Sequence, residues 1–434
     1  MKVLLVNPPN CGRSIPEEQY GITSLKQLFK GEPFGLEVLA GPLERHDVRI
    51  FDGKSETPQA FPEILESFSP DVVGFTSLTC EANTVIRQAA QVRRQSRAVV
   101  VVGGCHATYD PEYFNRPEFD YIVIGLGKKS FAELIEALAG RQTPEPIAGI
   151  APTFPGKTLS FLQRRFGRED LLDDIPPRYD LVAGYRDQYY LEQLGLGMGF
   201  VISAYGCTHE CSFCTIPKIT CGKYLTHSPK AVLRDMALLG EIPFVRFVDA
   251  NTFGDAGQAA LLCDMILESG LKKKIFADVR ADTVVKHFDL MKKWKEAGLY
   301  AVVVGFEDIT NERLSMYNKK YRQDVIQRAI DMLHQLGIVI IGDFIASPAD
   351  TEKDFANLEK FIIANEIEVP VISVLTPMPG TALYEEMKNE IVIFDLDYYT
   401  FTNAVTRTKM PEELFYRAYA ELVKSLHKNP HKPN

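Results

Sequence analysis

The chain has 434 residues, more than one hydrophobic core of ordinary size needs, and this length predicts two or three domains. Hydrophobic residues make up 46 % and charged residues 24 % of the sequence, which excludes a disordered, fibrous or disulfide-stapled protein. The net charge of -9 offers no basic footprint, so a nucleic-acid partner is not expected.

The first nine residues lack the apolar stretch and small-residue cleavage site of a signal peptide. No run approaches the roughly 18 apolar residues of a membrane span. We therefore expect a cytoplasmic protein without a membrane span. Eight cysteines are too few for a disulfide scaffold in so long a chain. In a reducing compartment, the three that cluster between residues 207 and 214 indicate metal binding or catalysis.

The first 140 residues alternate short β-branched runs with stretches of helical periodicity. This alternation is typical of a parallel sheet covered by helices, so it predicts an α/β fold with a Rossmann-like doubly wound domain over 1–140. Small or polar residues follow five of the strands, at the edge where such sheets bind ligands, although each glycine alone could simply form a tight turn. The expected strands are 3–6, 48–51, 72–76, 99–102 and 121–124, with a helix at 82–95.

Periodicity is lost between residues 140 and 197, where six prolines break the pattern, and this predicts a surface connector over 141–197. Six further strand–helix pairs follow, two fewer than a closed eightfold barrel has. We expect a partial (β/α)6 barrel over 198–385 and a helical tail over 386–434. The expected strands are 200–205, 244–248, 275–279, 301–306, 339–345 and 371–375. The expected helices are 231–239, 259–269, 288–297, 325–336, 354–365 and, in the tail, 411–427.

The segment from Cys207 to Cys214 has the pattern CxxxCxxC, directly after the first strand of the expected barrel. Three thiolates on one short loop suit three irons of a 4Fe-4S cube and leave the fourth iron open to a substrate. A zinc site completed by Cys221 or His209 is an alternative, although structural zinc ligands usually come in CxxC pairs. Unligated core cysteines are another, which the polar residues of the loop disfavour. The candidate ligands are Cys207, Cys211 and Cys214.

This pattern, with the aromatic Phe213 before its last cysteine, resembles the radical S-adenosylmethionine (radical SAM) superfamily. The resemblance implies that the three cysteines ligate a 4Fe-4S cluster, that S-adenosylmethionine chelates the open iron and that Phe213 is among the cofactor-binding residues. An electron from the cluster would then produce a deoxyadenosyl radical that abstracts hydrogen from an unactivated carbon. Similar motifs at later strand ends imply S-adenosylmethionine contacts from Asp249, Asn251, Arg280 and Glu307, although such residues also serve as helix caps or surface groups.

A doubly wound domain ahead of this barrel resembles the cobalamin-binding subfamily, through segments 71–79, 102–108 and 125–127. Two departures accompany the resemblance. Residues 7–11 replace the DxHxxG loop that supplies an axial histidine, which implies cobalamin bound base-off and His-off, and Leu126 and Lys128 stand where relatives usually have Glu. We expect His106 to contact the tail or a loop rather than cobalt. The implied cobalamin contacts are Thr76, Ser77, Leu78, Thr79, Gly103, Gly104, His106, Gly125 and Gly127.

Together the resemblances imply a cobalamin-dependent, class B radical SAM C-methyltransferase that moves a methyl group from methylcobalamin to a substrate radical under anaerobic conditions. The alternatives are a cyclase or oxidase with the same cofactors and, from another class, a non-catalytic cobalamin or iron–sulfur sensor. Relatives act on tetrapyrroles, hopanoids and other lipids, natural products and protein side chains. The short tail is compatible with a protein loop as substrate, such as the glutamine methylated in methyl-coenzyme M reductase. We expect a monomer that receives electrons from a ferredoxin or flavodoxin.

Overall fold

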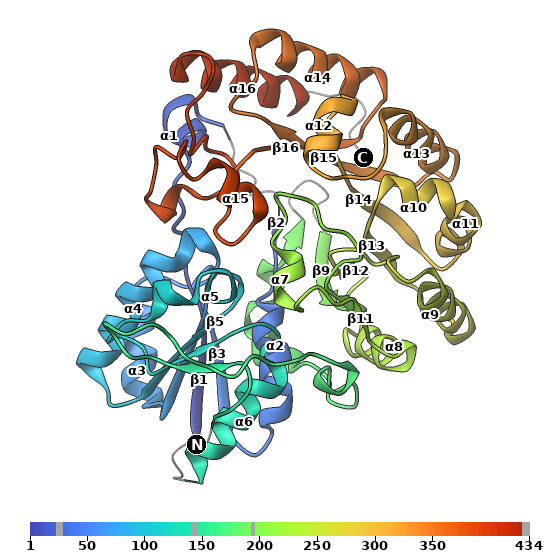
Figure 1. The fold of residues 1–434 in the computed structure, drawn as a ribbon. Helices are drawn as coiled ribbons and strands as arrows, with labels where there is room; N and C mark the ends of the chain where they lie inside the picture. Colours follow the sequence, from blue (N-terminus) through green and yellow to red (C-terminus); the bar gives the residue numbers. More distant parts are fainter. Residues whose placement is uncertain (23–28, 141–145, 192–195, 428–434) are drawn as a thin grey trace.

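The computed structural model describes residues 1–22, 29–140, 146–191 and 196–427. Two large sheets organise the chain, and Figure 1 shows them next to each other, with helices around the outside. The first sheet has the strand order β3-β1-β4-β5-β6-β7 and is parallel except for β7. Its strands are β1 (Lys2–Asn7), β3 (Asp47–Asp52), β4 (Val72–Thr76), β5 (Val99–Gly103), β6 (Tyr121–Val123) and β7 (Ile150–Pro152).

Helices cover both faces of the first sheet, as expected for strands that are apolar on both sides. On one face, Phe61 and Leu65 of α3 pack with Val85 and Val92 of α4. The other face is covered by α2 and α6. The doubly wound domain predicted from the sequence is therefore confirmed. The helices are α2 (Phe34–Ala40), α3 (Ala60–Phe68), α4 (Ala82–Gln95), α5 (Cys105–Tyr109) and α6 (Gly127–Ala139), with a 3-10 turn η3 (Thr79–Glu81).

The second sheet has the order β16-β15-β14-β13-β12-β9-β8-β2. The strand β9 and the strands β12 to β16 are parallel, which confirms a partial barrel of six strands in the described part of the chain. One face packs under the outer helices, where Trp294 is fully buried. The parallel strands are β9 (Leu196–Val201), β12 (Phe244–Phe247), β13 (Lys274–Val279), β14 (Leu299–Glu307), β15 (Val339–Ala346) and β16 (Val369–Val374).

The helices outside this sheet lie close to their predicted positions. Four short helices, α7, α10, α12 and α15, were not predicted. The helices are α7 (Ile216–Ile219), α8 (Pro229–Leu238), α9 (Ala256–Ser269), α10 (Ala281–Lys286), α11 (Phe288–Glu296), α12 (Asn311–Met316), α13 (Gln323–Gln335), α14 (Glu352–Ala364) and α15 (Ala382–Met387).

The connector is more ordered than its irregular sequence suggests. It supplies β7 to the first sheet, the 3-10 helix η6 (Tyr179–Gln188), and β8 (Tyr190–Leu191) to the second. The strand β2 (Phe29–Lys30), from the first 140 residues, pairs with β8. Strands of two or three residues carry almost no periodicity, which is why the sequence pattern did not predict them. The domain divisions at residues 140, 197 and 385 remain predictions. Strands on both sides of residue 140, β6 and β7, pair in the same sheet.

The first barrel strand, predicted as one segment over 200–205, is broken. The strand β9 ends at Val201, and β10 (Ala204–Tyr205) pairs instead with β11 (Leu225–Thr226) in a small antiparallel ladder. The backbone N–H groups of Ser203 and Ala204 donate to the carboxylate of Asp249 rather than to a neighbouring strand. A side chain thus replaces the sheet ladder at the position where the cysteine loop begins.

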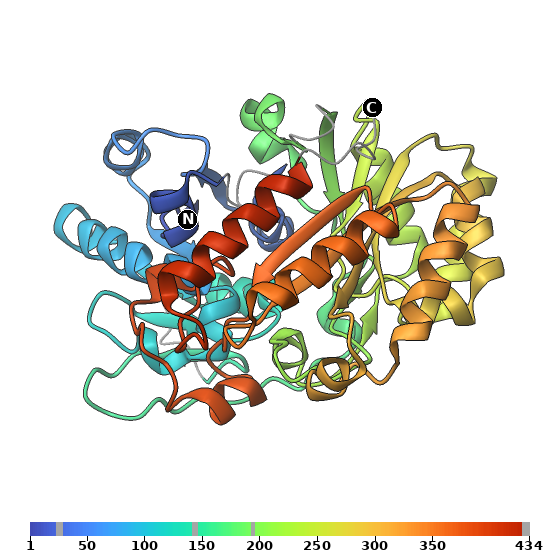
Figure 2. The ribbon, with the colours of Figure 1, turned by 90° about the horizontal axis from the view of Figure 1, so that it is seen from above.

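Both ends of the chain bind the two halves together. Figure 2 shows α16 (Glu412–His427) lying alongside α14, and α1 (Ile15–Tyr20) also contacts α16. The segment between α15 and α16 reaches the first sheet, where Leu396 and Tyr399 join the core around α3 and α4. None of the helices in the described ranges is long and apolar enough to cross a membrane.

Candidate active site

The three candidate cluster ligands lie on the loop that leaves β10. All three cysteines are free thiols of intermediate exposure. They are close enough for the thiolates of Cys207 and Cys214 to interact electrostatically with Cys211. The described residues hold no group of three His, Cys, Asp or Glu side chains arranged around a single metal ion. Each cysteine of a 4Fe-4S cube binds a different iron, however, so a loop of free, neighbouring thiols fits a cluster.

Burial raises the pKa of Cys211, and it raises the pKa of Cys214 to about 12. For Cys211 the nearby cations of Lys319 and Arg280 act in the opposite direction. Thiolates are the metal-binding form of cysteine, and ligation to iron supplies the positive charge that a buried thiolate needs. The loop is therefore suited to binding soft metal ions and poorly suited to acting as a set of exposed nucleophiles.

A turn at residues 316–320 fastens the cysteine loop from the side. The backbone N–H of Ser212 donates to the carbonyl of Tyr317 at 3.2 Å, and the Ser212 hydroxyl donates to the carbonyl of Met316 at 3.1 Å. The Asn318 amide donates to the carbonyl of Glu210 at 2.6 Å. The ring of Phe213 packs edge-on against Tyr317, with 5.5 Å between ring centroids. Phe213 is thus placed as a packing residue of this loop.

Asp249, predicted to contact S-adenosylmethionine, is occupied by the protein's own groups. Its Oδ1 atom accepts from the backbone N–H of Ser203 at 2.7 Å and of Ala204 at 3.0 Å, and Oδ2 accepts from the Ser203 hydroxyl. The side chain is almost completely buried. Asp249 therefore positions the start of the cysteine loop, and its contact with S-adenosylmethionine remains a prediction.

Asn251, two residues later, has an unused hydrogen-bond acceptor, whereas both carboxylate oxygens of Asp249 already accept hydrogen bonds. Its Nδ2 lies 3.4 Å from the Thr208 hydroxyl of the cysteine loop. Its Oδ1 is buried and has no hydrogen-bond partner among the described residues. A buried carbonyl oxygen without a donor is costly, so this atom is suited to a ligand N–H such as an ammonium group.

Arg280 and Glu307 lie on the same side of the cluster loop, but both are paired. Arg280 donates to both carboxylate oxygens of Asp282, at 2.9 and 3.2 Å. Glu307 accepts from Lys319 Nζ at 2.9 Å and has a left-handed φ of 66° at the end of β14. Lys319 was not singled out from the sequence, because a lysine in a polar Asn-Lys-Lys turn reads as a solvated residue.

The inner face of the half-barrel carries charged side chains. Because alternate residues of a strand share a face, Arg246, Asp278 and Asp343 point inward with the apolar residues of this face, Phe244 and Phe276. Arg246 forms an ion pair with Asp278. Burial and the neighbouring carboxylates raise the pKa of Asp343 well above its usual value. The interior therefore contains one more carboxyl group than this cation neutralises.

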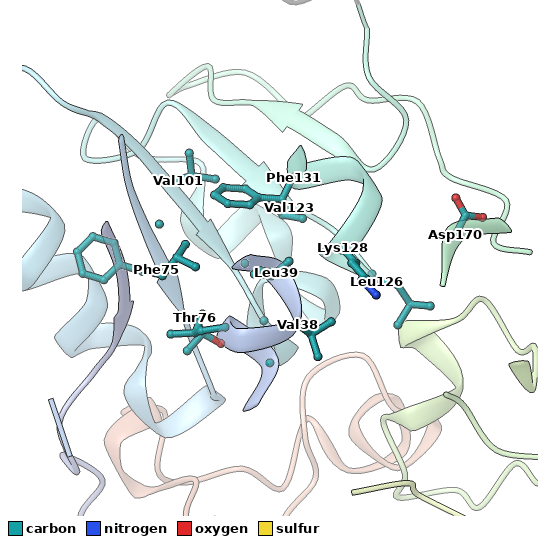
Figure 3. A pocket seen from close by; sticks show the side chains of 18 of the residues that line it. Val38, Leu39, Phe75, Thr76, Val101, Val123, Leu126, Lys128, Phe131 and Asp170 are labelled. Atoms are coloured by element: carbon teal, nitrogen blue, oxygen red, sulfur yellow. The ribbon is translucent and has the colours of Figure 1, made fainter. Parts of the chain in front are cut away.

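A cavity of about 180 Å³ opens in the first domain, between the sheet and the helices α2 and α6. Figure 3 shows the apolar side chains of Val101, Val123 and Phe131 near Leu39 and Val38 of α2. Glycines at strand positions and strand ends leave the space open. A Cβ at Gly74 would lie 3.1 Å from the Leu5 side chain, and one at Gly127 would lie 3.0 Å from Leu39, and both of these neighbours line the cavity. The lining glycines are Gly35, Gly74, Gly103, Gly104, Gly125 and Gly127.

The structure brings five of the predicted cobalamin residues to this cavity and places four elsewhere. Ser77, Leu78, Thr79 and His106 are not in its lining. The buried Thr79 hydroxyl has no hydrogen-bond partner in the described ranges. The residues that do line it are Thr76, Gly103, Gly104, Gly125 and Gly127. An apolar, glycine-lined slot at the carboxyl ends of β4–β6 fits the insertion of a flat heteroaromatic group, and contacts elsewhere on cobalamin remain predictions for the other four residues.

His106 is completely buried against aromatic rings rather than facing the cavity. Its ring lies 5.1 Å from that of Tyr113 and 5.5 Å from that of Phe114, measured between centroids. Neither ring nitrogen has a hydrogen-bond partner within the described residues. Burial lowers the pKa of His106 to about 4, so the imidazole is neutral at physiological pH.

Lys128, one of the two departures from the cobalamin motif, has a structural function in the wall of the cavity. Its Nζ donates to the carbonyls of Leu171, Leu172 and Ile175 at 3.0, 2.9 and 2.7 Å. These carbonyls belong to the connector, and Leu171 lines the cavity. A glutamate could not make these bonds, because an ionised carboxylate only accepts. Lys128 thus holds the connector against the cavity.

The short helix α5 joins the cavity to the cysteine loop. It begins directly after Gly104, and it packs against α7, the helix that begins two residues after Cys214. A second cavity, of about 460 Å³, lies between the first domain, the connector and α7, and it shares Gly125 with the first. The two candidate sites are therefore adjacent.

Comparison with known families supports the two-part organisation. Residues 23–135 match the B12 binding domain model, and residues 201–362 match the radical SAM superfamily model. The chain is 29% identical over 424 residues to an uncharacterised methyltransferase of Pyrococcus horikoshii, covering 94% of this chain and 88% of that protein. It is also 29% identical over 410 residues to the hopanoid C-3 methylase of Methylococcus capsulatus, covering 92% and 76%.

A solved structure has the same fold. The radical S-adenosylmethionine methyltransferase TsrM from Kitasatospora setae, with cobalamin and a 4Fe-4S cluster bound, superposes with a TM-score of 0.75 at 18% identity. The match covers 98% of this chain and 90% of that one. The B12-binding domain and the radical SAM domain expected from the sequence are thus both present, in the expected order. The chain therefore combines a B12-binding domain with a radical SAM domain, the two-domain organisation of cobalamin-dependent radical S-adenosylmethionine enzymes.

Proposed function

We propose that this protein is a C-methyltransferase that places a methyl group on an unactivated carbon. The observation that carries the proposal is the packing of α5 against α7: α5 begins at the glycine-lined cavity of the B12-binding domain, and α7 directly follows the loop of three cysteines. When bound, the 4Fe-4S cluster with S-adenosylmethionine supplies radical chemistry, and cobalamin supplies a transferable methyl group. The names of the two relatives, a methyltransferase and a methylase, agree with this outcome.

The residues of the chain divide the work of binding and positioning. We propose that Cys207, Cys211 and Cys214 hold the cluster, and that Asn251 Oδ1 accepts from the amino group of S-adenosylmethionine. Arg280 and Glu307 remain proposed contacts for the rest of that cofactor, although each must first share its present partner, Asp282 or Lys319. Charged groups paired in this way are preorganised, so little reorientation is needed when a ligand binds.

We propose the interior of the half-barrel as the substrate chamber. Arg246, Asp278 and Asp343 face it and would meet polar groups of the substrate. The substrate remains a proposal among small molecules, lipids and a protein loop, including the glutamine loop of methyl-coenzyme M reductase. One named relative is a hopanoid methylase, which favours testing a lipid first.

Electron supply and compartment are also proposals. A ferredoxin or flavodoxin is the proposed electron donor, because a radical SAM enzyme needs one-electron reduction. A cytoplasmic location is proposed because eight cysteines in so long a chain are too few for a disulfide scaffold, which is usual in a reducing compartment. We also propose that the protein is a monomer.

The test is reconstitution under anaerobic conditions with iron, sulfide and hydroxocobalamin, followed by incubation with methyl-labelled S-adenosylmethionine and a reductant. We expect stoichiometric cobalamin, four irons per chain and labelled product. Cys211→Ala should lose iron and activity, whereas Cys221→Ala, on the exposed residue of the same segment, should keep both. A modified but unlabelled product would indicate cyclisation or oxidation. Absence of deoxyadenosine in the wild type would indicate a sensor instead.

A further inference from the structure

Lys319 is a buried cation next to the cysteine loop. It lies in the 316–320 turn between two residues with left-handed backbone, Asn318 at φ 58° and Lys320 at φ 62°. Only 4 % of Lys319 is exposed, whereas Lys320 is exposed to solvent. A lysine is rarely buried unless it is paired, because removing its ammonium from water is costly. Its position therefore needs an explanation beyond the turn itself.

The ammonium of Lys319 is held in a defined place. Its Nζ pairs with Glu307 Oε1 at 2.9 Å, and its carbonyl accepts from Arg280 Nη2 at 2.6 Å. Although burial lowers the pKa of Lys319, the Glu307 carboxylate raises it above the usual value, so the side chain stays charged. The same turn is tied to the cysteine loop through Asn318 and Glu210. The distance between this charge and the loop is therefore fixed by hydrogen bonds on both sides.

The turn that carries this charge is bonded to the loop on both sides of Cys211. Asn318 donates to the carbonyl of Glu210, and Ser212 donates to the carbonyls of Tyr317 and Met316. Arg280 is neutralised by a two-point contact with Asp282, whereas Glu307 contacts Lys319 through one oxygen. Within a partly buried site the effective dielectric constant is lower than in water, so a fixed charge in this turn acts more strongly on the loop than it would in solvent.

We propose that Lys319 and Glu307 set the reduction potential of the cluster, Lys319 by raising it and Glu307 by lowering it. Reduction adds one electron, from an external reductant, to a cluster already ligated by three thiolates. A fixed cation stabilises the more negative reduced form, and a fixed anion destabilises it. This inference rests on the proposed function, because it requires a cluster on Cys207, Cys211 and Cys214. Lys319 is thus a tuning residue that acts through the protein field and does not ligate iron.

The test is a redox titration of the reconstituted full chain, followed by electron paramagnetic resonance without S-adenosylmethionine, so that contacts to that cofactor do not contribute. We expect Lys319→Gln to lower the midpoint potential by about 59 mV, which equals a tenfold change in the one-electron equilibrium constant. Glu307→Gln should raise the potential, and Lys319→Arg should leave it near the wild-type value. Lys320→Gln is the matched control, because it removes an exposed charge from the same turn.

Equal potentials in the wild type, Lys319→Gln and Glu307→Gln would overturn the inference while leaving the methyltransferase proposal intact. If Lys319→Gln fails to hold iron, Glu307→Gln decides: an upward shift supports the charge effect, and an unchanged or lower potential contradicts it. A wild-type protein that takes up no cluster would instead contradict the proposed function itself. The potential is informative because loss of packing alone would not move the two neutral variants in opposite directions.

Discussion

The carboxylate of Asp249, at the end of β12, accepts a hydrogen bond from the backbone N–H of Ser203 at 2.7 Å. This bond, with those from Ala204 and the Ser203 hydroxyl, ends β9 and sets the direction in which the chain leaves toward the cysteines. The motif around Asp249 was interpreted as a cofactor contact. In the structure it orients the loop that carries the candidate cluster ligands.

Asp249→Ala should therefore damage the scaffold before it affects cofactor recognition. It leaves two backbone N–H groups without an acceptor, and we expect a loss of about 2 to 3 kcal/mol in the free energy of unfolding. The measurement is denaturant unfolding of the apoprotein together with the iron content after reconstitution. Unchanged stability and iron content would contradict the positioning function.

Asn251→Ala is the contrasting variant, two residues away. Because Asn251 Oδ1 has no partner in the described residues, the protein loses little when it is removed. We expect stability within about 1 kcal/mol of the wild type and an approximately tenfold or greater loss of S-adenosylmethionine affinity, as for a hydrogen bond to a charged group. Equilibrium binding of S-adenosylmethionine to the reconstituted enzyme checks this. Unchanged affinity would remove Asn251 from the proposed binding residues.

The cavity in the first domain can be filled from Gly35. This residue lines the cavity, and a Cβ added there meets no heavy atom within 4 Å. Gly35→Phe should occupy much of the 180 Å³ and lower cobalamin affinity by at least about tenfold. Gly35→Ala is the control, since alanine favours the helix α2 and leaves most of the space free. Equilibrium dialysis with hydroxocobalamin measures both, and equal affinities would place the cofactor elsewhere.

Lys128→Met should loosen the connector. The substitution removes the ammonium group that donates to the carbonyls of Leu171, Leu172 and Ile175. We therefore expect the free energy of unfolding to fall by about 2 to 3 kcal/mol. Lys129→Met is the neighbouring control, at a side chain that is about one-third exposed and forms a 3.6 Å ion pair with Asp170. This control variant should lose less than about 1 kcal/mol of unfolding free energy. Limited proteolysis of the connector gives an independent measurement, and similar cleavage of both variants would contradict the prediction.

His106 should make the protein sensitive to mild acid. Burial lowers its folded pKa from 6.5 to about 4, so the unfolded chain binds a proton first as the pH falls. Stability is therefore fully present above about pH 6.5 and is lost as the pH falls toward 4, by about 2 kcal/mol between pH 7 and pH 5. Unfolding free energies of the wild type and His106→Leu at both pH values test this. The change in unfolding free energy between pH 7 and pH 5 should be larger for the wild type than for His106→Leu by about 2 kcal/mol. An equal change in both proteins would contradict the lowered pKa of His106.

Elements with a regular apolar pattern and motifs of adjacent residues could be predicted from this sequence. The helix α4 was predicted residue for residue, because Val85, Ala89 and Val92 follow the helical period closely. The short strands β2, β7 and β8 were not predicted, since strands of two or three residues have no period to detect. The hydrogen bonds of Asp249 were also invisible, because a carboxylate after a strand has the same sequence pattern whether it binds a ligand or a backbone.

The sequence by itself determined the two sheets, their order along the chain and the three cysteines, because buried strands need continuous apolar runs and the candidate metal ligands are adjacent in the chain. Tertiary structure alone decided which polar residues are free. Lys319 becomes a buried charge beside Cys211, Asp249 is fully bonded, and Asn251 keeps an open acceptor. These outcomes depend on contacts between residues far apart in the chain, and hydrogen-bond partners brought together by folding leave no local period.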